Sequence, residues 1–291
     1  MEKPIVVLDA CVLIPMPLCD TLLRAADQDM YKFYTSPKIL EETTRNLAKL
    51  LKKTQNLDSS IADQKAKKRV EQIQKAFPEA LVYPSESLIS TLDNDPKDRH
   101  VLAAAIEAQK ILTDDGFHHL VIIVTHNLKD FPNDILSKYH VIAISPDEFL
   151  LKLIKIYDSP LLFNLLQKQA EVHKHKVIDL LGRLEKGNVS KFVIVILNNY
   201  YSDEIIEIIK RIENIINRFG WTNNENNKFL VGKFYKLVAT NQAVIVNHHT
   251  EGIIIESTCN SISISNLSCQ HLKNLGSFVN QAYEITCSNA N

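Results

Sequence analysis

The sequence predicts an α/β protein built on a parallel, doubly wound sheet with helices on both faces. Over the first 150 residues, short β-branched runs alternate with helical patterns, as in folds made of repeating strand–helix units. The run at residues 121–125 is apolar almost throughout, which is typical of a strand buried on both faces of a parallel sheet. Asp9 directly follows the first such run, at the sheet edge where ligand sites form in these folds.

The individual elements follow from these runs and from helix start signals. Ser36 precedes Pro37 as an N-cap and opens one helix, and Asp95 precedes Pro96 in the same way and opens another. Expected strands lie at residues 5–8, 31–35, 81–83, 121–125 and 141–144. Expected helices lie at residues 20–26, 36–51, 60–75, 96 onward, 147–157 and 160–184.

The amino-acid composition changes near Gly187, which predicts a second domain. Residues 188–291 hold 17 asparagines, whereas residues 1–187 hold 6. Strand-like runs there accompany two helical patterns, the order expected of a small α+β domain with an antiparallel sheet. The strand-like runs lie at residues 192–197, 234–239, 243–247, 252–256 and 262–265, and the helices at 202–219 and 269–283. The expected division is a main domain at 1–150, its helical extension at 151–187 and the small domain at 188–291.

The overall composition limits the classes of protein without choosing one. The apolar share of 45% and the charged share of 23% are average for a globular protein, and a net charge of −1 creates no field toward nucleic acid or a membrane. No apolar run reaches the ~18 residues of a membrane span. Because the sequence enters a predicted strand at once, we expect no signal peptide. The five cysteines lack metal-like spacing. We therefore expect reduced thiols and a cytoplasmic location.

Several acids stand at expected strand ends or in first helical turns, and each has an ordinary structural role as an alternative. Asp9 and Asp130 are placed to cap turns, and Asp98 is placed to complete a capping box. Glu41 and Glu42 open a helix, where acids interact favourably with the helix dipole, and spacing alone hardly separates the two.

Taken together, these acids predict more than capping. Strand ends of a parallel sheet share one edge, so three or four of the acids would converge there and raise one another's pKa. Oxygen ligands suit Mg²⁺ or Mn²⁺ better than zinc. Such a cation activates water and neutralises charge at a phosphodiester. The predicted reaction class is therefore metal-assisted phosphodiester hydrolysis.

Four segments resemble, in order, the successive motifs of PIN-domain ribonucleases, the family that includes the VapC-type toxins. They are LDACVLIPMPLCDTLL, SPKILEETTRNL, DPKDRHVLAAA and VTHNLKDFP, and the resemblance covers about residues 4–150. The helices up to about Leu184 resemble the tail of one bacterial PIN subfamily. The resemblance implies a Rossmann-like parallel sheet and cleavage of single-stranded RNA with Mg²⁺ or Mn²⁺ as cofactor.

The resemblance also implies roles for particular residues. It places the family's first three acids on Asp9, Glu42 and Asp98, with Glu42 chosen over its neighbour. The fourth acidic position falls on Asn127, which removes one charge and weakens a second metal unless Asp130, three residues later, compensates. All five are candidate catalytic residues, and the four acids among them are candidate metal ligands.

Supporting roles are expected around these residues. Thr125 matches a hydroxyl that orients the first acid or a metal-bound water, and Asp95 adds outer charge. Arg99 either holds the scissile phosphate or pairs with an acid, and the pair is favoured. A basic run on the helix at 60–75 would contact RNA phosphates, although a solvated helix face is the commoner reason for such a run. It consists of Lys65, Lys67, Lys68 and Arg69.

Two hypotheses describe the whole protein. The first is a metal-dependent endoribonuclease, the toxin of a toxin–antitoxin pair, whose antitoxin would insert an Arg or Lys into the acidic cleft. The second is a non-catalytic nucleic-acid- or protein-binding adaptor, which Asn127 favours and the three intact acids oppose. A haloacid-dehalogenase-like phosphatase is set aside, because it needs a second acid where Cys11 stands. The small domain would bind a partner, regulate the enzyme, or form a homodimer through a sheet edge.

Overall fold

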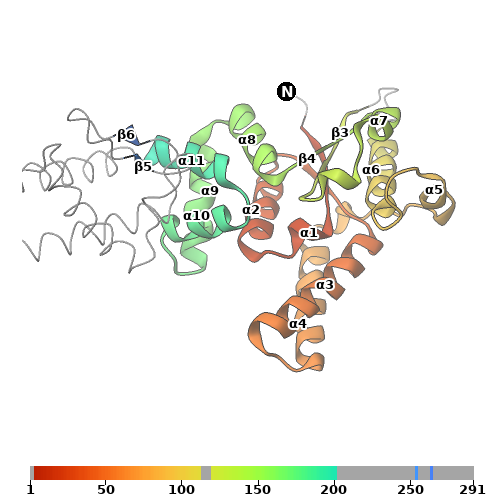
Figure 1. Ribbon diagram of the computed structural model, residues 1–291, viewed down its shortest axis with the longest axis horizontal. Helices are drawn as coiled ribbons and strands as arrows, with labels where there is room; N and C mark the ends of the chain where they lie inside the picture. The colour runs from red at the N-terminus through yellow and green to blue at the C-terminus, as the bar shows by residue number, and fades with distance from the viewer. Residues whose placement is uncertain (1–2, 113–118, 202–252, 255–262, 265–291) are drawn as a thin grey trace, which may run out of the picture. The chain divides into compact units, whose positions relative to one another are not determined.

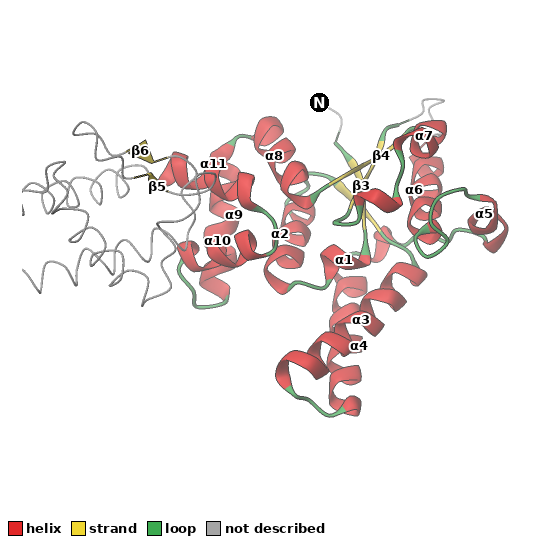
Figure 2. Cartoon of the chain, viewed as in Figure 1, coloured by secondary structure: helices red, strands yellow, loops and turns green. Residues whose placement is uncertain are grey.

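A computed structural model describes residues 3–112, 119–201, 253–254 and 263–264 of the 291-residue chain. The chain divides into two compact units, residues 1–174 and 175–291. The first unit contains a four-stranded sheet surrounded by helices (Figures 1 and 2). Within the described ranges, no helix has the length and apolar character needed to span a bilayer.

The sheet is parallel throughout, and its strands are short. β1 (Ile5–Leu8) lies between β2 (Lys32–Tyr34) and β3 (Val121–Val124), and β4 (Val141–Ile144) pairs with the other side of β3. Every residue of β1 and β3 is buried, as expected for the central strands of a parallel sheet. The predicted α/β class with a parallel, helix-flanked sheet is therefore confirmed.

α6 (Arg99–Leu112) packs against the sheet and contacts β1, β2 and β3. Its buried side carries small residues, since Ala103, Ala104, Ala105 and Ala108 are all fully buried. Small side chains allow a helix to lie close to the strands it covers, so the N-terminal end of α6 is held near the carboxyl ends of the central strands.

The predicted start of α6 at Pro96 is wrong, because a turn precedes the helix. Asp95 Oδ1 accepts a hydrogen bond from the N–H of Lys97 at 2.9 Å, and the N–H of Asp98 donates to the carbonyl of Asp95 at 2.9 Å. An Asp side chain that bonds the backbone two residues ahead stabilises a turn in competition with a helix. Asp98 therefore lies directly before the first helical residue.

The helices α2 (Met16–Asp27) and α9 (Ser159–Val172) pack together and are joined by a buried amide. Gln169 Oε1 accepts a hydrogen bond from the hydroxyl of Thr21 at 2.8 Å, and its Nε2 donates to the carbonyl of Pro17 at 3.0 Å. A buried side-chain amide is stable only with such partners. α9 follows α8 (Pro146–Tyr157), which begins with a complete capping box at Ser145 and Glu148.

α3 (Pro37–Gln55) and α4 (Ser59–Ala76) form a long helical hairpin that extends away from the sheet in Figure 1. Ser36 caps α3 by accepting from the N–H of Ile39, and Asp58 caps α4 by accepting from the N–H of Ser60. Between the helices, Asn56 adopts the left-handed conformation at φ 50°, which ends α3. These caps agree with the predicted helices at 36–51 and 60–75.

Short elements complete the first unit. The predicted strand at 81–83 is reduced to one bridge between Leu81 and Thr35, and Pro84, which follows at once, has no N–H to continue a ladder. The remaining short elements are α1 (Ala10–Leu13), η1 (Pro78–Ala80), α5 (Glu86–Thr91), η3 (Leu128–Asp130), α7 (Asn133–Leu136) and η4 (Ser137–Tyr139).

Two predictions for the later part of the chain are wrong. The helix expected at 160–184 is interrupted, since α9 ends at Val172 and α10 spans Val177–Lys186, with Lys174 between them at φ 53°. The run at 192–197, expected to be a strand, lies in α11 (Ser190–Tyr200). Its buried side repeats at helical spacing, but a short apolar run does not distinguish a buried strand from a helix by sequence. The buried residues are Phe192, Val193, Ile196 and Leu197.

The second unit contains one described strand pair. β5 (Ile253–Ile254) and β6 (Ser263–Ile264) are antiparallel and lie within the runs expected to be strands at 252–256 and 262–265. The other elements expected after residue 201, at 202–219, 234–239, 243–247 and 269–283, lie outside the described residues. The domain limits at 150 and 187 stay predictions.

Candidate active site

Polar side chains follow the two central strands at their carboxyl ends. β1 and β3 are paired in register with Leu8 opposite Val124, so Asp9 and Thr125 leave the sheet side by side. The N–H of Asp9 also donates to the carbonyl of Val124 at 3.2 Å. In the strand order β2-β1-β3-β4 the chain moves to one side of β1 for β2 and to the other for β3. This topological switch point is where open α/β sheets bind ligands.

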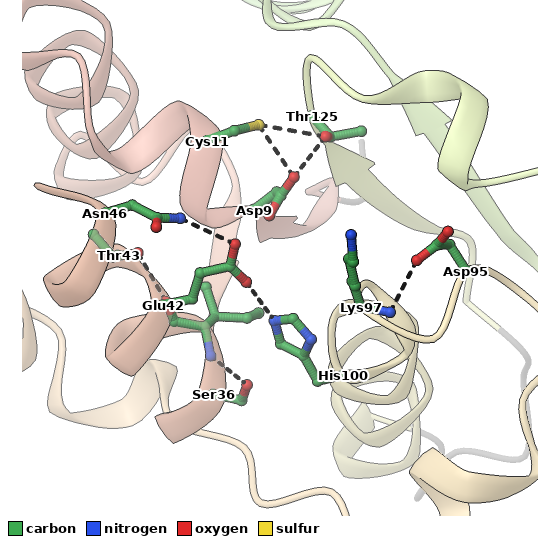
Figure 3. A network of polar contacts seen from close by, with 11 residues as sticks. Asp9, Cys11, Ser36, Glu42, Thr43, Asn46, Asp95, Lys97, His100 and Thr125 are labelled. Atoms are coloured by element: carbon green, nitrogen blue, oxygen red, sulfur yellow. Dashed lines mark hydrogen bonds and ion pairs between the residues drawn. The ribbon is translucent and has the colours of Figure 1, made fainter. Parts of the chain in front are cut away.

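Asp9 is almost completely buried and is held by two donors. Its carboxylate Oδ2 accepts a hydrogen bond from the Thr125 hydroxyl at 2.6 Å and from the Cys11 thiol at 3.1 Å (Figure 3). Asp9 is 3% exposed, and although it occupies the N-cap position of α1, its side chain makes no capping hydrogen bond. The alternative role, in which Asp9 only caps a turn, is therefore not the role its carboxylate has here.

Cys11 belongs to the same network, and its thiol is protonated. Burial, followed by the negative charge of Asp9, raises the pKa of the Cys11 thiol to about 12. The N–H of His126 donates to Cys11 Sγ at 3.3 Å, and Sγ lies 3.4 Å from Thr125 Oγ1. The thiol is thus a hydrogen-bond donor to Asp9 and not a reactive thiolate.

Glu42 reaches the site from α3 and is held by two residues. Asn46 Nδ2 donates to Glu42 Oε1 at 3.2 Å, and His100 Nε2 lies 3.2 Å from Glu42 Oε2 (Figure 3). The contact between His100 Nε2 and Glu42 Oε2 is within ion-pair distance but is not aligned as a hydrogen bond. His100 Nε2 is therefore buried without a hydrogen-bond partner among the residues that the structure describes. His100 is also the main reason that the pKa of Glu42 lies below its ordinary value. Glu41 is exposed, whereas Glu42 is half-buried and its charge acts on Asp98.

The pKa of Asp98 is affected by the other acids of the site. Its pKa is raised to about 6, first by burial and then by the negative charges of Asp9, Asp130 and Glu42. Carboxylates act on one another in this way only when they are close. These four residues, Asp9, Glu42, Asp98 and Asp130, are called the acidic group below. Strongly shifted acids at a switch point are typical of a functional site.

The acidic group fits a hard cation by its chemistry, while its ligand geometry is not preformed. It offers only carboxylate oxygens, the ligands that Mg²⁺ and Mn²⁺ prefer. The raised pKa of Asp98 indicates that the opposing influence of His100 does not offset burial and the neighbouring negative charges. However, no three acids, histidines or cysteines of the described residues stand at positions that would already hold a metal ion. Metal binding therefore requires some of these side chains to rotate toward a common point.

The remaining predicted residues lie around the acidic group. Asn127 is exposed at the start of η3, and its N–H donates to Thr125 Oγ1 at 2.9 Å. Asp95 is exposed and holds the turn before α6. Arg99 was expected to pair with an acid, but its Nε donates to the backbone carbonyl of Asn94 at 3.2 Å, and within the described ranges it has no carboxylate partner.

The basic run on α4 is divided by the structure. Lys65, Lys67 and Lys68 are exposed, as a solvated face requires. Arg69 instead donates to the carbonyls of Leu13 and Ile14, each at 2.9 Å, and ties α4 to the end of α1. Its inclusion in one basic surface was therefore wrong, because its guanidinium is used internally. An open depression of about 450 Å³ lies on α4, lined by Gln64, Lys67, Lys68, Glu71, Gln72 and Lys75.

Sequence reasoning missed two residues that contact the acidic group. Cys11 was interpreted as a reduced thiol and as a residue that is not an acid, although its position two residues after Asp9 was a usable signal. His100 follows Asp98 by two residues, but its contact with Glu42 joins α6 to α3 and no local pattern announces it. Both contacts depend on tertiary packing.

The fold and the acidic group define an α/β domain with a carboxylate site at the switch point of its sheet. Residues 5–129 match the family model described as the PIN domain, and this segment belongs to that family. The resemblance seen in the sequence motifs is thus confirmed for the segment, and the match supports a nuclease class.

One curated protein matches part of this chain, and its name refers to a ribonuclease. "Putative ribonuclease VapC50" of Mycobacterium tuberculosis (strain ATCC 25618 / H37Rv) is 39% identical to this chain over 79 residues, which are 27% of this chain and 41% of the relative. The chain therefore spans less than half the length of the curated relative it matches. No solved structure was found to match the chain significantly.

Proposed function

We propose that this chain is a metal-dependent endoribonuclease that hydrolyses phosphodiester bonds of single-stranded RNA with Mg²⁺ or Mn²⁺. The observation that carries the proposal is the gathering of Asp98 with Asp9, Glu42 and Asp130 at the switch point of the sheet, and the raised pKa of Asp98 agrees with it. A purely structural acid has no need of three acidic neighbours, which cost stability unless positive charge compensates them. Membership of residues 5–129 in the PIN domain family supports the same assignment.

In this proposal the acidic group holds the cation, and the surrounding residues hold the acidic group. A bound divalent cation would supply an activated water and positive charge beside the scissile phosphate. Asp9 is oriented by Thr125, and Glu42 is kept ionised by His100. Asn127 stands at the family's fourth acidic position, where it contributes no charge, and Asp130 supplies the negative charge on that side. Asp95 adds charge at the rim.

The substrate's phosphates would contact basic residues outside the acidic group. Lys67 and Lys68 line the depression on α4, and Lys65 is exposed on the same helix. Arg99 lies directly after Asp98 at the start of α6 and is a candidate for contact with the scissile phosphate. Because phosphate contacts release counterions, such binding would weaken steeply with salt.

The biological setting we propose is the toxin of a toxin–antitoxin pair in the cytoplasm. The partly matching relative is named a putative ribonuclease of the VapC type, which supports this setting. An antitoxin would neutralise the acidic group by inserting an Arg or Lys side chain. The part of the chain after residue 187 would then bind a partner or form a homodimer.

The direct test is cleavage of a pool of single-stranded RNAs by the full-length chain with Mn²⁺ and with Mg²⁺. We expect wild type to cut and Asp9→Asn to leave the pool intact at equal concentration. Glu41→Gln is the matched control, because Glu41 is the exposed neighbour of Glu42 and should cut like wild type. Absence of cleavage by wild type with either cation, or equal cleavage by Asp9→Asn, would contradict the proposal.

Asn127 favours a second function, that of a non-catalytic adaptor that keeps the fold. Isothermal titration with Mn²⁺ separates the two functions. An adaptor should show no cation binding that Asp98→Ala abolishes, whereas the proposed nuclease should lose its binding in that variant.

A further inference from the structure

We propose that Cys11 is a positioning residue which, together with Thr125, fixes one carboxylate oxygen of Asp9 and so presents the other oxygen to the divalent cation. The inference rests on the function proposed above and adds a residue to its machinery. It also predicts that a thiol at this place can be replaced by a hydroxyl but not by a methyl group.

Two parallel chains of hydrogen bonds converge on one oxygen of Asp9. The N–H of Asn127 donates to Thr125 Oγ1 at 2.9 Å, and the Thr125 hydroxyl donates to Asp9 Oδ2 at 2.6 Å. The N–H of His126 donates to Cys11 Sγ at 3.3 Å, and the thiol donates to the same Oδ2 at 3.1 Å. In each chain a backbone N–H occupies the acceptor side of the side chain, so the side-chain proton is directed to Asp9.

The two donors come from different elements, which is why both are needed. Thr125 follows β3, whereas Cys11 lies in the first turn of α1 (Figure 3). The terminal torsion of an Asp side chain has a broad energy minimum, so one hydrogen bond leaves the carboxylate free to rotate about it. Two donors from separate directions fix the plane of the carboxylate. Within the described residues, Asp9 Oδ1 accepts no hydrogen bond and remains the oxygen for a cation.

A packing role is the competing explanation, because a half-buried cysteine is also a small apolar side chain. The two explanations predict different orders of substitution. If the thiol acts as a donor, Cys11→Ser keeps the function and Cys11→Ala loses it. If the thiol only fills space, Cys11→Ala is tolerated at least as well as Cys11→Ser, which buries an additional polar group.

The first experiment titrates Mn²⁺ into the full-length variants and measures cleavage at saturating Mn²⁺. We expect Cys11→Ala to weaken Mn²⁺ binding about tenfold, the lower range for the loss of a group that orients a metal ligand. Cys11→Ser should stay within about threefold of wild type. Cys19→Ala removes the buried thiol of α2 and should change neither reading. Equal affinity of wild type and Cys11→Ala, or equally weak binding by Cys11→Ser and Cys11→Ala, would overturn the inference.

The second experiment needs no metal and separates this inference from the proposed function. The infrared S–H band of Cys11 is identified in metal-free protein as the band that Cys11→Ser removes. A thiol that donates to a carboxylate has a lowered stretching frequency, so Asp9→Asn should move the band upward. A band that stays unchanged in Asp9→Asn refutes the positioning role, even if the enzyme is active. If the band moves but wild type binds no cation and cuts no RNA, only the proposed function fails.

Discussion

The strand side and the helix side of the acidic group are stabilised in different ways. On the strand side, Asp9 is nearly fully buried and receives hydrogen bonds from Thr125 and Cys11. On the helix side, Asp98 is half-buried, receives no hydrogen bond within the described residues, and has a pKa raised to about 6. The difference teaches that one acid is fixed by donors, while the negative charge of the other is offset only in part, by His100. The second arrangement favours a functional role over a structural one.

The largest expected effect comes from neutralising each acid separately. We expect Asp9→Asn and Asp98→Asn each to lower RNA cleavage at least about 100-fold, because each removes a ligand of the proposed cation. Their effects on stability should have opposite signs in metal-free protein at pH 7.5. Asp9→Asn weakens hydrogen bonds to a charged acceptor and should destabilise by about 2 kcal/mol. Asp98→Asn removes repulsion and should raise the free energy of unfolding, as urea titration would measure.

Asp9→Asn and Asp98→Asn also test whether the strand side and the helix side of the acidic group really differ. If Asp98→Asn destabilises the fold as Asp9→Asn does, Asp98 has a structural partner and the two sides do not differ. Circular dichroism of both variants before titration controls for loss of the fold.

The next effect is a dependence of stability on pH. The folded pKa of Asp98, about 6, lies above its ordinary value of 3.8, so the folded state binds this proton more tightly than the unfolded state. The free energy of unfolding should therefore rise as the pH falls from about 6 to 4. Glu42 acts in the opposite direction, since its lowered pKa gives stability that is lost as acid protonates it. Urea titrations of wild type, Asp98→Asn and Glu42→Gln across this range isolate the two contributions.

Each variant gives a distinct curve. Asp98→Asn should lose the stabilisation by acid, whereas Glu42→Gln should show more of it than wild type. Identical pH profiles for wild type and Asp98→Asn would mean that Asp98 titrates at its ordinary pKa and that the acidic group does not act on it.

A smaller effect is expected for the histidine on the helix side. His100→Ala removes the main cause of the lowered pKa of Glu42, so that pKa should rise toward 4.5. Carbon NMR of the labelled Glu42 carboxyl measures it directly, and Asp98 should at the same time lose the opposing influence of His100. We expect cleavage to fall by about tenfold or less, because the ligand remains but its orientation is lost. An unchanged Glu42 pKa would show that the 3.2 Å contact between His100 and Glu42 has no electrostatic consequence.

The smallest effect concerns the lysines far from the acids in sequence. Replacing Lys67 and Lys68 by Gln should decrease the affinity for RNA a few-fold. The plot of log affinity against log salt should also become less steep, by about 0.7 for each RNA phosphate that the variant no longer binds. Lys152→Gln, at an exposed residue of α8, is the matched control. Fluorescence anisotropy with labelled single-stranded RNA gives both values. Slopes equal to that of the control would place the RNA away from α4.

Local patterns in the sequence predicted the sheet and the acids at its edge, because both depend on short runs. The β-branched run before Asp9 and the run before Thr125 each identify a central strand, and parallel strands end at one edge. The helix cap at Ser36 likewise has a local cause. The main architecture and the position of Asp9 therefore followed from the sequence.

Other features could not be predicted, because they depend on contacts between distant residues. Arg69 looked like part of a charged surface until its partners at Leu13 and Ile14 were visible. The contact of His100 with Glu42 joins two helices, and no spacing rule relates them. The strand expected at 192–197 failed because apolar runs of this length suit either element.

The hydrogen bond between Thr125 and Asp9 joins residues that are 116 positions apart. During synthesis the first 80 residues can form β1, β2 and the helical hairpin from contacts near in sequence, but the carboxylate of Asp9 has no hydroxyl partner until β3 has been made. The pair is thus completed only once residue 125 has been made, and a nascent chain that stops before it carries the first acid without the group that orients it.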